Sequence, residues 1–152
     1  MLKIEIEFED LDERLTGFNM GHMTFHGNIG TVTSKNKTPS QAMMILLSIS
    51  ELLSGLRRLT LTKSTQYEFI GADSSFIVYF DKLKNGKISV RSQGQEIIRS
   101  DAKNILTSVF RDVNAFLSDV LPNLPKDDLG RKSLLYSLPK YEAFLKEISP
   151  NE

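Results

Sequence analysis

FIVYFDKLKNGKISV, residues 76–90, is the stretch of sequence that decides the fold. Two runs rich in β-branched and aromatic residues flank Asn85-Gly86, a pair typical of a tight β-hairpin turn in which both central residues take a positive φ. The first run is apolar at successive positions, which predicts a central strand covered on both faces. Together with the run QYEFI (residues 66–70) and a turn at residues 71–75, the stretch predicts a three-stranded antiparallel meander.

The N-terminal residues predict a further, half-buried strand, because apolar and charged residues alternate there. One face carries Leu2, Ile4, Ile6 and Phe8, and the other carries Lys3, Glu5, Glu7 and Glu9. Residues 18–34 are rich in Thr, Phe, Val and Gly, and they predict two strands joined by a two-residue turn at Gly27-Asn28.

The segment TPSQ (residues 38–41) has the composition of a helix start. Thr38 is the expected N-cap, Pro39 the first helical residue and Gln41 the residue that returns a hydrogen bond to the cap. Apolar residues then recur at helical spacing: Ala42, Ile45, Leu46, Ile49, Leu52, Leu53 and Leu56. We expect this helix to be covered on more than one side and to fray between Gly55 and Leu59.

Two later stretches of the sequence also predict helices. Apolar residues at helical spacing from Ser100 predict a long helix that ends at Pro122. Residues 127–148 predict two short helices interrupted at Pro139, because proline lacks the N–H used inside a helix. The whole order predicts one α+β domain over residues 1–152, with a mainly antiparallel sheet of about five or six strands and helices packed against it.

The composition argues against several classes of function. Nineteen basic residues balance nineteen acidic ones, so the chain lacks the excess positive charge of most nucleic-acid-binding proteins. The absence of cysteine excludes disulfides and thiolate sites, and it suits the reducing cytoplasm. The N-terminus has no signal-peptide pattern, and the longest apolar run is too short to span a membrane. We expect a cytoplasmic protein that needs no cofactor and binds neither nucleic acid nor a membrane.

His22 and His26 raise the question of a metal site, because they lie four residues apart. On a helix this spacing brings two ligands together, whereas on a strand it separates them by about 13 Å. The surrounding glycine, threonine and phenylalanine residues favour a strand. We therefore interpret His22, Thr24 and His26 as the polar face of a strand whose other face carries Met23 and Phe25.

GADSS (residues 71–75) raises the question of a serine nucleophile. The nucleophile elbow places its serine between a strand and a helix, whereas these serines lie between two predicted strands. Asp and Ser favour such turns because their side chains bond local backbone amides. We interpret Asp73, Ser74 and Ser75 as turn residues.

The first thirteen residues contain a cluster of acids: Glu5, Glu7, Glu9, Asp10, Asp12 and Glu13. Catalysis by paired carboxylates needs a desolvated acid with a raised pKa, whereas glutamates on the polar face of a strand stay hydrated. Two interpretations remain, a solvated face that discourages unwanted sheet pairing and a binding surface for a basic protein. Under the second, we expect the partner to contact Glu5, Glu7, Glu9, Asp12 and Glu13.

Residues 69–90, followed by the long amphipathic helix and by DDLGRKSLLYSL (residues 127–138), resemble small uncharacterised bacterial α+β domains that include immunity proteins of polymorphic toxin systems. The resemblance implies a cytoplasmic protein that binds and blocks a cognate toxin and catalyses no reaction. Our first hypothesis is therefore a non-enzymatic protein-interaction module. Two alternatives are a ligand-binding or enzymatic site that uses His22, His26 and Asp73, and a homodimer that covers excess apolar surface.

Overall fold

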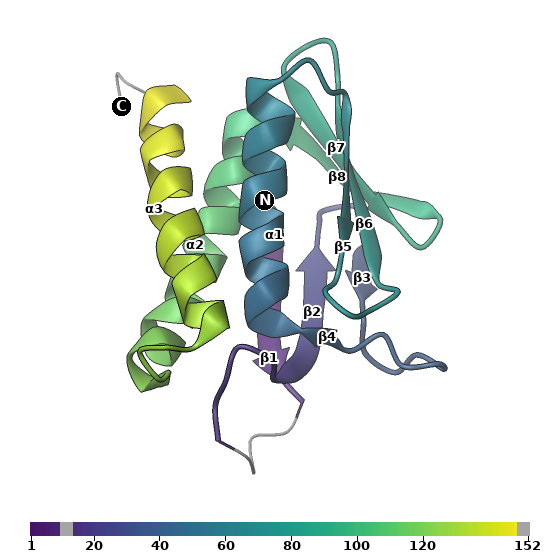
Figure 1. Ribbon diagram of the computed structural model, residues 1–152. Coiled ribbons are helices and arrows are strands. Elements are labelled where there is room, and N and C mark those ends of the chain that lie inside the picture. The colour runs from purple at the N-terminus through teal and green to yellow at the C-terminus, as the bar shows by residue number, and fades with distance from the viewer. Residues whose placement is uncertain (10–13, 149–152) are drawn as a thin grey trace.

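Two antiparallel sheets and three α-helices form the part of the chain that the structure describes, residues 1–9 and 14–148 of a computed structural model (Figure 1). Sheet A contains β1 (Lys3–Phe8), β2 (Met20–His26), β3 (Thr31–Thr33) and β4 (Met43–Met44). Sheet B contains β5 (Gln66–Ile70), β6 (Ile77–Lys82), β7 (Lys87–Ser92) and β8 (Gln95–Asp101). The helices are α1 (Ile45–Leu61), α2 (Ala102–Val120) and α3 (Leu129–Ile148), with a 3-10 turn, η1 (Leu121–Asn123), after α2.

The α+β class and the antiparallel pairing are confirmed, but the described strands form two sheets of four instead of one sheet of five or six. In sheet A, β2 pairs with β1, β3 and β4, whereas sheet B follows the chain order. The two sheets meet where the Ile29 N–H donates to the Ile97 carbonyl at 2.9 Å and the Gln95 amide donates to the Thr31 carbonyl at 3.2 Å. The Gln93 amide also donates to the Thr33 carbonyl at 2.9 Å, so a loop residue and two side chains make these contacts and no strand ladder runs from β3 into β8.

Phe25 of β2 joins the inner faces of the two sheets. Its side chain is fully buried, and its ring centroid lies 6.4 Å from that of Phe69, 6.2 Å from that of Phe76 and 6.5 Å from that of Phe80. These three rings come from β5, the following turn and β6. The predicted alternation in β1 is also confirmed, since Ile4 is buried in the same core whereas Lys3 and Glu5 on either side of it are exposed. These four large buried rings contribute apolar surface that holds the sheets together.

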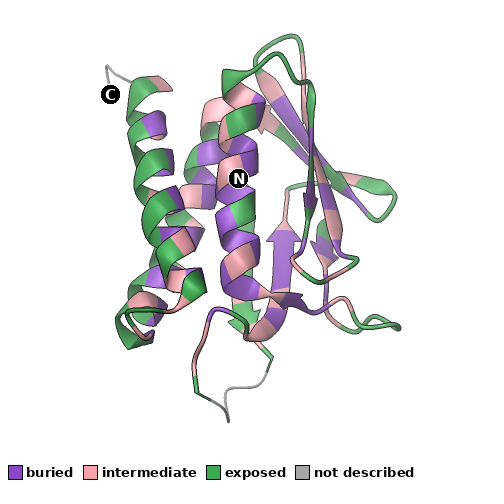
Figure 2. Cartoon of the chain, in the orientation of Figure 1, coloured by how far each residue is buried: buried purple, intermediate pink, exposed green. Residues whose placement is uncertain are grey.

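Helix α1 is enclosed between sheet B and α3, as predicted from its wide apolar surface, and buried residues recur along its length (Figure 2). On the sheet side, the Tyr67 hydroxyl donates to the Glu51 carbonyl at 2.9 Å. On the α3 side, the Ser50 hydroxyl lies 2.6 Å from that of Ser133 and 2.7 Å from that of Ser137. Small polar residues thus let two helices approach closely while their hydroxyl groups satisfy one another.

Both predicted ends of α1 are wrong. It begins at Ile45 instead of at Thr38, because Met43 and Met44 pair with β2 and hold the chain extended. It continues to Leu61 without fraying at Gly55. The Lys82 ammonium stabilises this end, since it donates to the Leu59 carbonyl at 2.7 Å and to the Thr62 carbonyl at 2.8 Å.

The hairpin at Asn85-Gly86 exists, but its turn differs from the expected two-residue type. The Leu83 N–H donates to the Lys87 carbonyl at 2.8 Å, which leaves a three-residue loop. Gly86 has a φ of +78°, whereas Asn85 is not among the residues with positive φ. Such a loop needs one left-handed residue at its end, and glycine takes that conformation without strain.

The turn between β2 and β3 also differs from expectation. It spans residues 27–30, with the Gly27 N–H donating to the Gly30 carbonyl at 2.8 Å, and is not a two-residue turn at Gly27-Asn28. The meander is four strands long, because β8 follows a tight turn in which Gln93 and Gly94 have φ values of +50° and +80°.

Strand β6 is covered on one face only, contrary to the prediction. Val78 and Phe80 are fully buried, whereas Ile77 and Tyr79 are half-buried and lie on the opposite face. Figure 1 shows all three helices on the same side of sheet B. None of the described helices therefore covers the outer face of this sheet.

Helix α2 matches its prediction, but α3 is one helix that continues through Pro139. Pro139 lies on the exposed face of α3. The carbonyl that loses its partner belongs to Leu135, a residue that is 49% exposed, so water can satisfy it. Along the described residues, no helix is long and apolar enough to cross a membrane.

Gly55 provides a test of the close packing between α1 and sheet B. A Cβ atom at this position would overlap the Tyr67 ring. We expect Gly55→Ala to lower the free energy of unfolding by about 1–3 kcal/mol in denaturant titrations, as overpacked cores do. Ser54→Ala, one position earlier on α1, is the matched control with little change. If Gly55→Ala instead stabilised the protein by about 1 kcal/mol, as alanine does in an open helix, that result would contradict the close contact between α1 and the Tyr67 ring.

Candidate functional site

The two histidines lie on β2, on the face of sheet A opposite the core. Met23 and Phe25 are fully buried, whereas His22 and His26 are half-buried on the other face, where Thr24 lies between them and is buried. The interpretation of this stretch as a two-faced strand is confirmed.

Each histidine bonds to a hydroxyl group of a neighbouring residue. His22 Nδ1 lies 2.8 Å from Ser34 Oγ, and His26 Nδ1 lies 3.2 Å from Thr31 Oγ1. Within residues 1–9 and 14–148, no group of three or more His, Asp or Glu side chains is placed to hold a metal ion. The geometry gives the histidines a part in pairing the strands of sheet A.

Three acidic residues, Glu5 and Glu7 of β1 and Glu9 just after it, each lie near a histidine or lysine side chain. Their carboxylate oxygens lie at ion-pair distances: Glu5 3.2 Å from His26, Glu7 2.8 Å from Lys35 and Glu9 3.9 Å from His22. The Glu5 and His26 atoms are close but not aligned for a hydrogen bond. Exposed pairs of this kind contribute little stability, but Lys35 places a positive charge beside the acidic face. The other predicted partner-binding residues, Asp12 and Glu13, lie outside the described residues, as does Asp10.

Asp73 and Ser74 form the turn between β5 and β6, as predicted. The Ser74 hydroxyl donates to the Gln41 carbonyl at 2.8 Å and accepts from the Phe76 N–H at 3.1 Å. Asp73 has a φ of +56°, a conformation that Asp tolerates in turns. In the part of the chain that is described, no hydrogen bond or ion pair joins Asp73 to His22 or His26.

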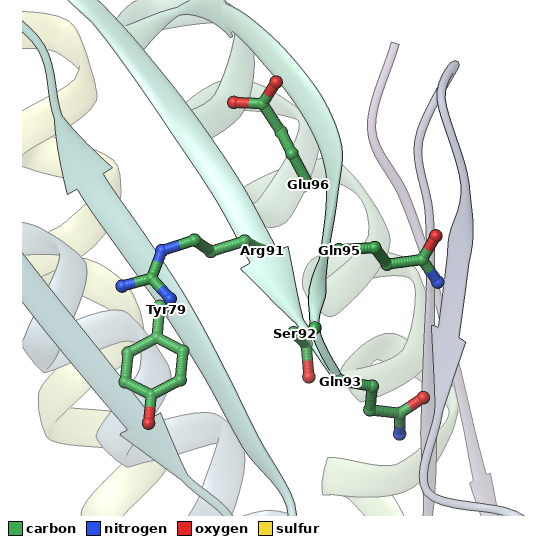
Figure 3. Close-up of a pocket in the computed structure, with 7 residues that line it drawn as sticks. Tyr79, Arg91, Ser92, Gln93, Gln95 and Glu96 are labelled. Carbon is green, nitrogen blue, oxygen red and sulfur yellow. The ribbon is translucent and has the colours of Figure 1, made fainter.

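The outer face of sheet B carries a polar network that crosses three strands. The Asp81 carboxylate accepts from Arg91 Nε at 2.6 Å and from the Gln66 amide at 2.7 Å. The Arg91 guanidinium also lies over the Tyr79 ring, with Cζ 4.4 Å from the ring centroid (Figure 3). A carboxylate on one side and an aromatic ring on the other therefore fix the orientation of this guanidinium.

A hollow of about 220 Å³ lies beside the Arg91–Tyr79 stack, at the turn between β7 and β8 (Figure 3). Ser92, Gln93 and Glu96 line it together with the stacked pair. The lining offers a cation, a carboxylate, hydroxyl groups and an amide. Some of these groups already bond within the fold, since the Ser92 hydroxyl donates to the Ile77 carbonyl and the Gln93 amide donates to the Thr33 carbonyl.

Glu96 lies at the centre of a second cluster on this face. Ser89 donates a hydrogen bond to its carboxylate, and Arg99 Nη2 lies 3.0 Å away. The Ser89 hydrogen bond, followed by those from Arg99, holds the pKa of Glu96 below its ordinary value.

The outer face of sheet B is the candidate site that sequence reasoning missed, because the Arg91–Tyr79 stack depends on the register of β6 and β7, and the hollow beside it depends on the further strand β8. The signal for β8 was present in Gln93-Gly94, a tight-turn pair between two alternating runs.

Comparisons with protein-family models, with curated proteins and with solved structures found no match for this chain.

Ser89→Ala tests the Glu96 cluster. A carboxylate with a lowered pKa stabilises the fold above its unfolded-state pKa, near 4.5, and that stabilisation is lost as the pH falls through the folded-state value. In Ser89→Ala we expect the pKa of Glu96 to rise toward 4.5, as measured by NMR titration of its side-chain carboxyl carbon. Ser118→Ala, on the exposed side of α2, should leave it unchanged. An unchanged Glu96 pKa in Ser89→Ala would contradict the assigned cause.

Proposed function

We propose that the chain is a non-enzymatic protein-interaction module that binds its partner through the outer face of sheet B. The observation that carries this proposal is the Arg91 guanidinium stacked over Tyr79, on a sheet face that none of the described helices covers. Arginine and tyrosine are enriched among the residues that dominate the energetics of protein interfaces.

The orientation of Arg91 is set before any partner arrives, which favours binding. Its side chain is 44% exposed, yet the contacts with Asp81 and Tyr79 already restrict it. A side chain ordered in advance loses less conformational entropy when it enters an interface. Ile70, which is 45% exposed, and Ile77 add apolar surface on the same face.

The acidic strand is the alternative contact surface within the same function. Its face carries Glu5, Glu7 and Glu9, but Lys3 and Lys35 reduce the charge of these described residues from −3 to −1 with neutral histidines. A basic partner would have to compete with the ion pairs already formed there. This weighs in favour of sheet B as the main contact.

The resemblance to immunity proteins supports one kind of partner, a toxin domain that this chain binds and blocks. Inhibition requires only that the bound chain cover the toxin's site, and Arg91 and Tyr79 would anchor that contact. The proposed function therefore requires no catalytic activity of the chain itself.

Capture of the partner by a tagged form of the protein tests the proposed function. We expect the wild type to retain one protein in near-equal amount from a lysate of the source organism. The double variant Tyr79→Ala/Arg91→Ala should retain about tenfold less, because two central interface residues are truncated. Quantitative mass spectrometry measures the captured amounts, and circular dichroism checks that the variant is folded.

Two controls make this experiment decisive. Lys84→Ala removes one exposed positive charge at the loop between β6 and β7, and it should capture the partner like the wild type. The triple variant Glu5→Gln/Glu7→Gln/Glu9→Gln removes the acidic charge without placing new cations beside His26 or Lys35. Loss of the partner in the triple variant alone would move the contact to sheet A, and capture of no protein would contradict the interaction function.

A further inference from the structure

The fold covers the edges of its strands unequally. At the outer edge of β1, Asp112 on α2 accepts from the Ile4 N–H at 2.7 Å, and Arg111 donates to the Leu2 carbonyl at 3.1 Å. At the edge of β8, the Ile97 carbonyl accepts from the Ile29 N–H at 2.9 Å. These edges are therefore occupied by groups of the same chain.

Strand β5 forms the other edge of sheet B, and its outward backbone groups follow from its register. The Thr65 carbonyl accepts from the Lys82 N–H at 2.7 Å, and the Gly71 N–H donates to the Phe76 carbonyl at 2.9 Å. Because backbone groups alternate in direction, the odd-numbered residues of β5 bond to β6 and the even-numbered residues face away. The outward residues are Gln66, Glu68 and Ile70, and all three are exposed.

The outward backbone groups of β5 are largely without partners. The Gln66 carbonyl accepts from the Ser64 hydroxyl at 3.2 Å. In the described chain, no other hydrogen bond reaches an outward N–H or carbonyl of Gln66, Glu68 or Ile70. An edge with a donor and an acceptor at every second residue is complementary to another extended chain.

A groove of about 300 Å³ runs between this edge and the C-terminal half of α1. Its α1 side includes Gly55, Arg58 and Leu59, and its strand side includes Tyr67 and Glu68. Gly55, Leu59 and Tyr67 are buried and form an apolar floor, whereas Arg58 and Glu68 are exposed at its margins. A chain lying along β5 would place every second side chain over this floor.

We propose that the β5 edge takes up an extended segment of the partner protein as a fifth strand of sheet B, with apolar side chains in the groove beside α1 and a basic side chain opposite Glu68. The assignment rests on the proposed interaction function and names the kind of partner segment. Opposite charges on directly opposed strand residues stabilise pairing. Glu68 therefore selects a basic residue on the outer face, and the groove selects apolar residues on either side of it.

A second copy of this chain is a poor occupant of the same edge. Antiparallel pairing of two β5 strands along their full length would set Gln66 opposite Ile70 of the other copy. It would also set the two Glu68 carboxylates directly opposite each other, and like charges there are destabilising. The edge thus disfavours its own dimer while it accepts a basic segment.

The test uses the end-blocked peptide TVKVT, whose two valines face one side and whose lysine faces the other. In NMR titrations of the whole chain, we expect shift changes at β5 and along the groove-facing side of α1. Glu68→Pro removes an N–H that bonds nothing within the fold, and it should weaken peptide binding about tenfold. Glu68→Ala keeps that N–H and removes only the charge, so we expect it to weaken binding about twofold to fivefold. If Glu68→Pro does not fold, Ile70→Pro removes another outward N–H in its place.

Several outcomes would overturn strand addition. These are no shift change at β5 with millimolar peptide, equal binding by the wild type and the folded proline variant, and a stable dimer of the free protein with β5 at its interface. None of them contradicts the proposed function if the captured partner is still lost in Tyr79→Ala/Arg91→Ala. Conversely, a captured partner that is retained by the proline variant would remove the strand-addition model alone.

Discussion

The burial of α1 between sheet B and α3 is the constraint on which the rest of the structure depends. Gly55 allows the Tyr67 ring to reach the helix backbone, and the hydroxyl groups of Ser50, Ser133 and Ser137 fill the contact with α3. The helix can cover only the inner face of sheet B. The outer face and the β5 edge are left for other contacts. The packing of α1 in the core therefore determines which surface of sheet B is available for the proposed binding.

Helices and strands in which apolar residues recur with a regular period could be predicted from the sequence, whereas the residues at which they begin and end could not. The alternation in β1 and the helical spacing in α2 each match the structure because one face of each element is buried. Thr38, Pro39 and Gln41 satisfy a local capping rule, yet pairing of Met43 and Met44 with β2 delays the helix to Ile45. At Pro139 a local rule fails for a different reason, because the lost hydrogen bond lies on the solvent side of α3.

The candidate site was predicted less well because its contacts join residues that are distant in sequence. The strand interpretation of His22 and His26 is a local inference and holds. The pairing of Glu7 with Lys35 depends on how β1, β2 and β3 align, and the stack of Arg91 over Tyr79 depends on the register of β6 and β7. A sequence pattern fixes which face a residue occupies, but only the register fixes its neighbours.

The openness of the β5 edge is the central claim, and residue-resolved amide hydrogen exchange of the free protein tests it most directly. The account predicts fast exchange at Gln66, Glu68 and Ile70, whose N–H groups face outward, and slow exchange at Tyr67 and Phe69, which bond to β6. Protection of the Glu68 amide equal to that of Phe69 would mean that the edge is already covered, and it would contradict the account.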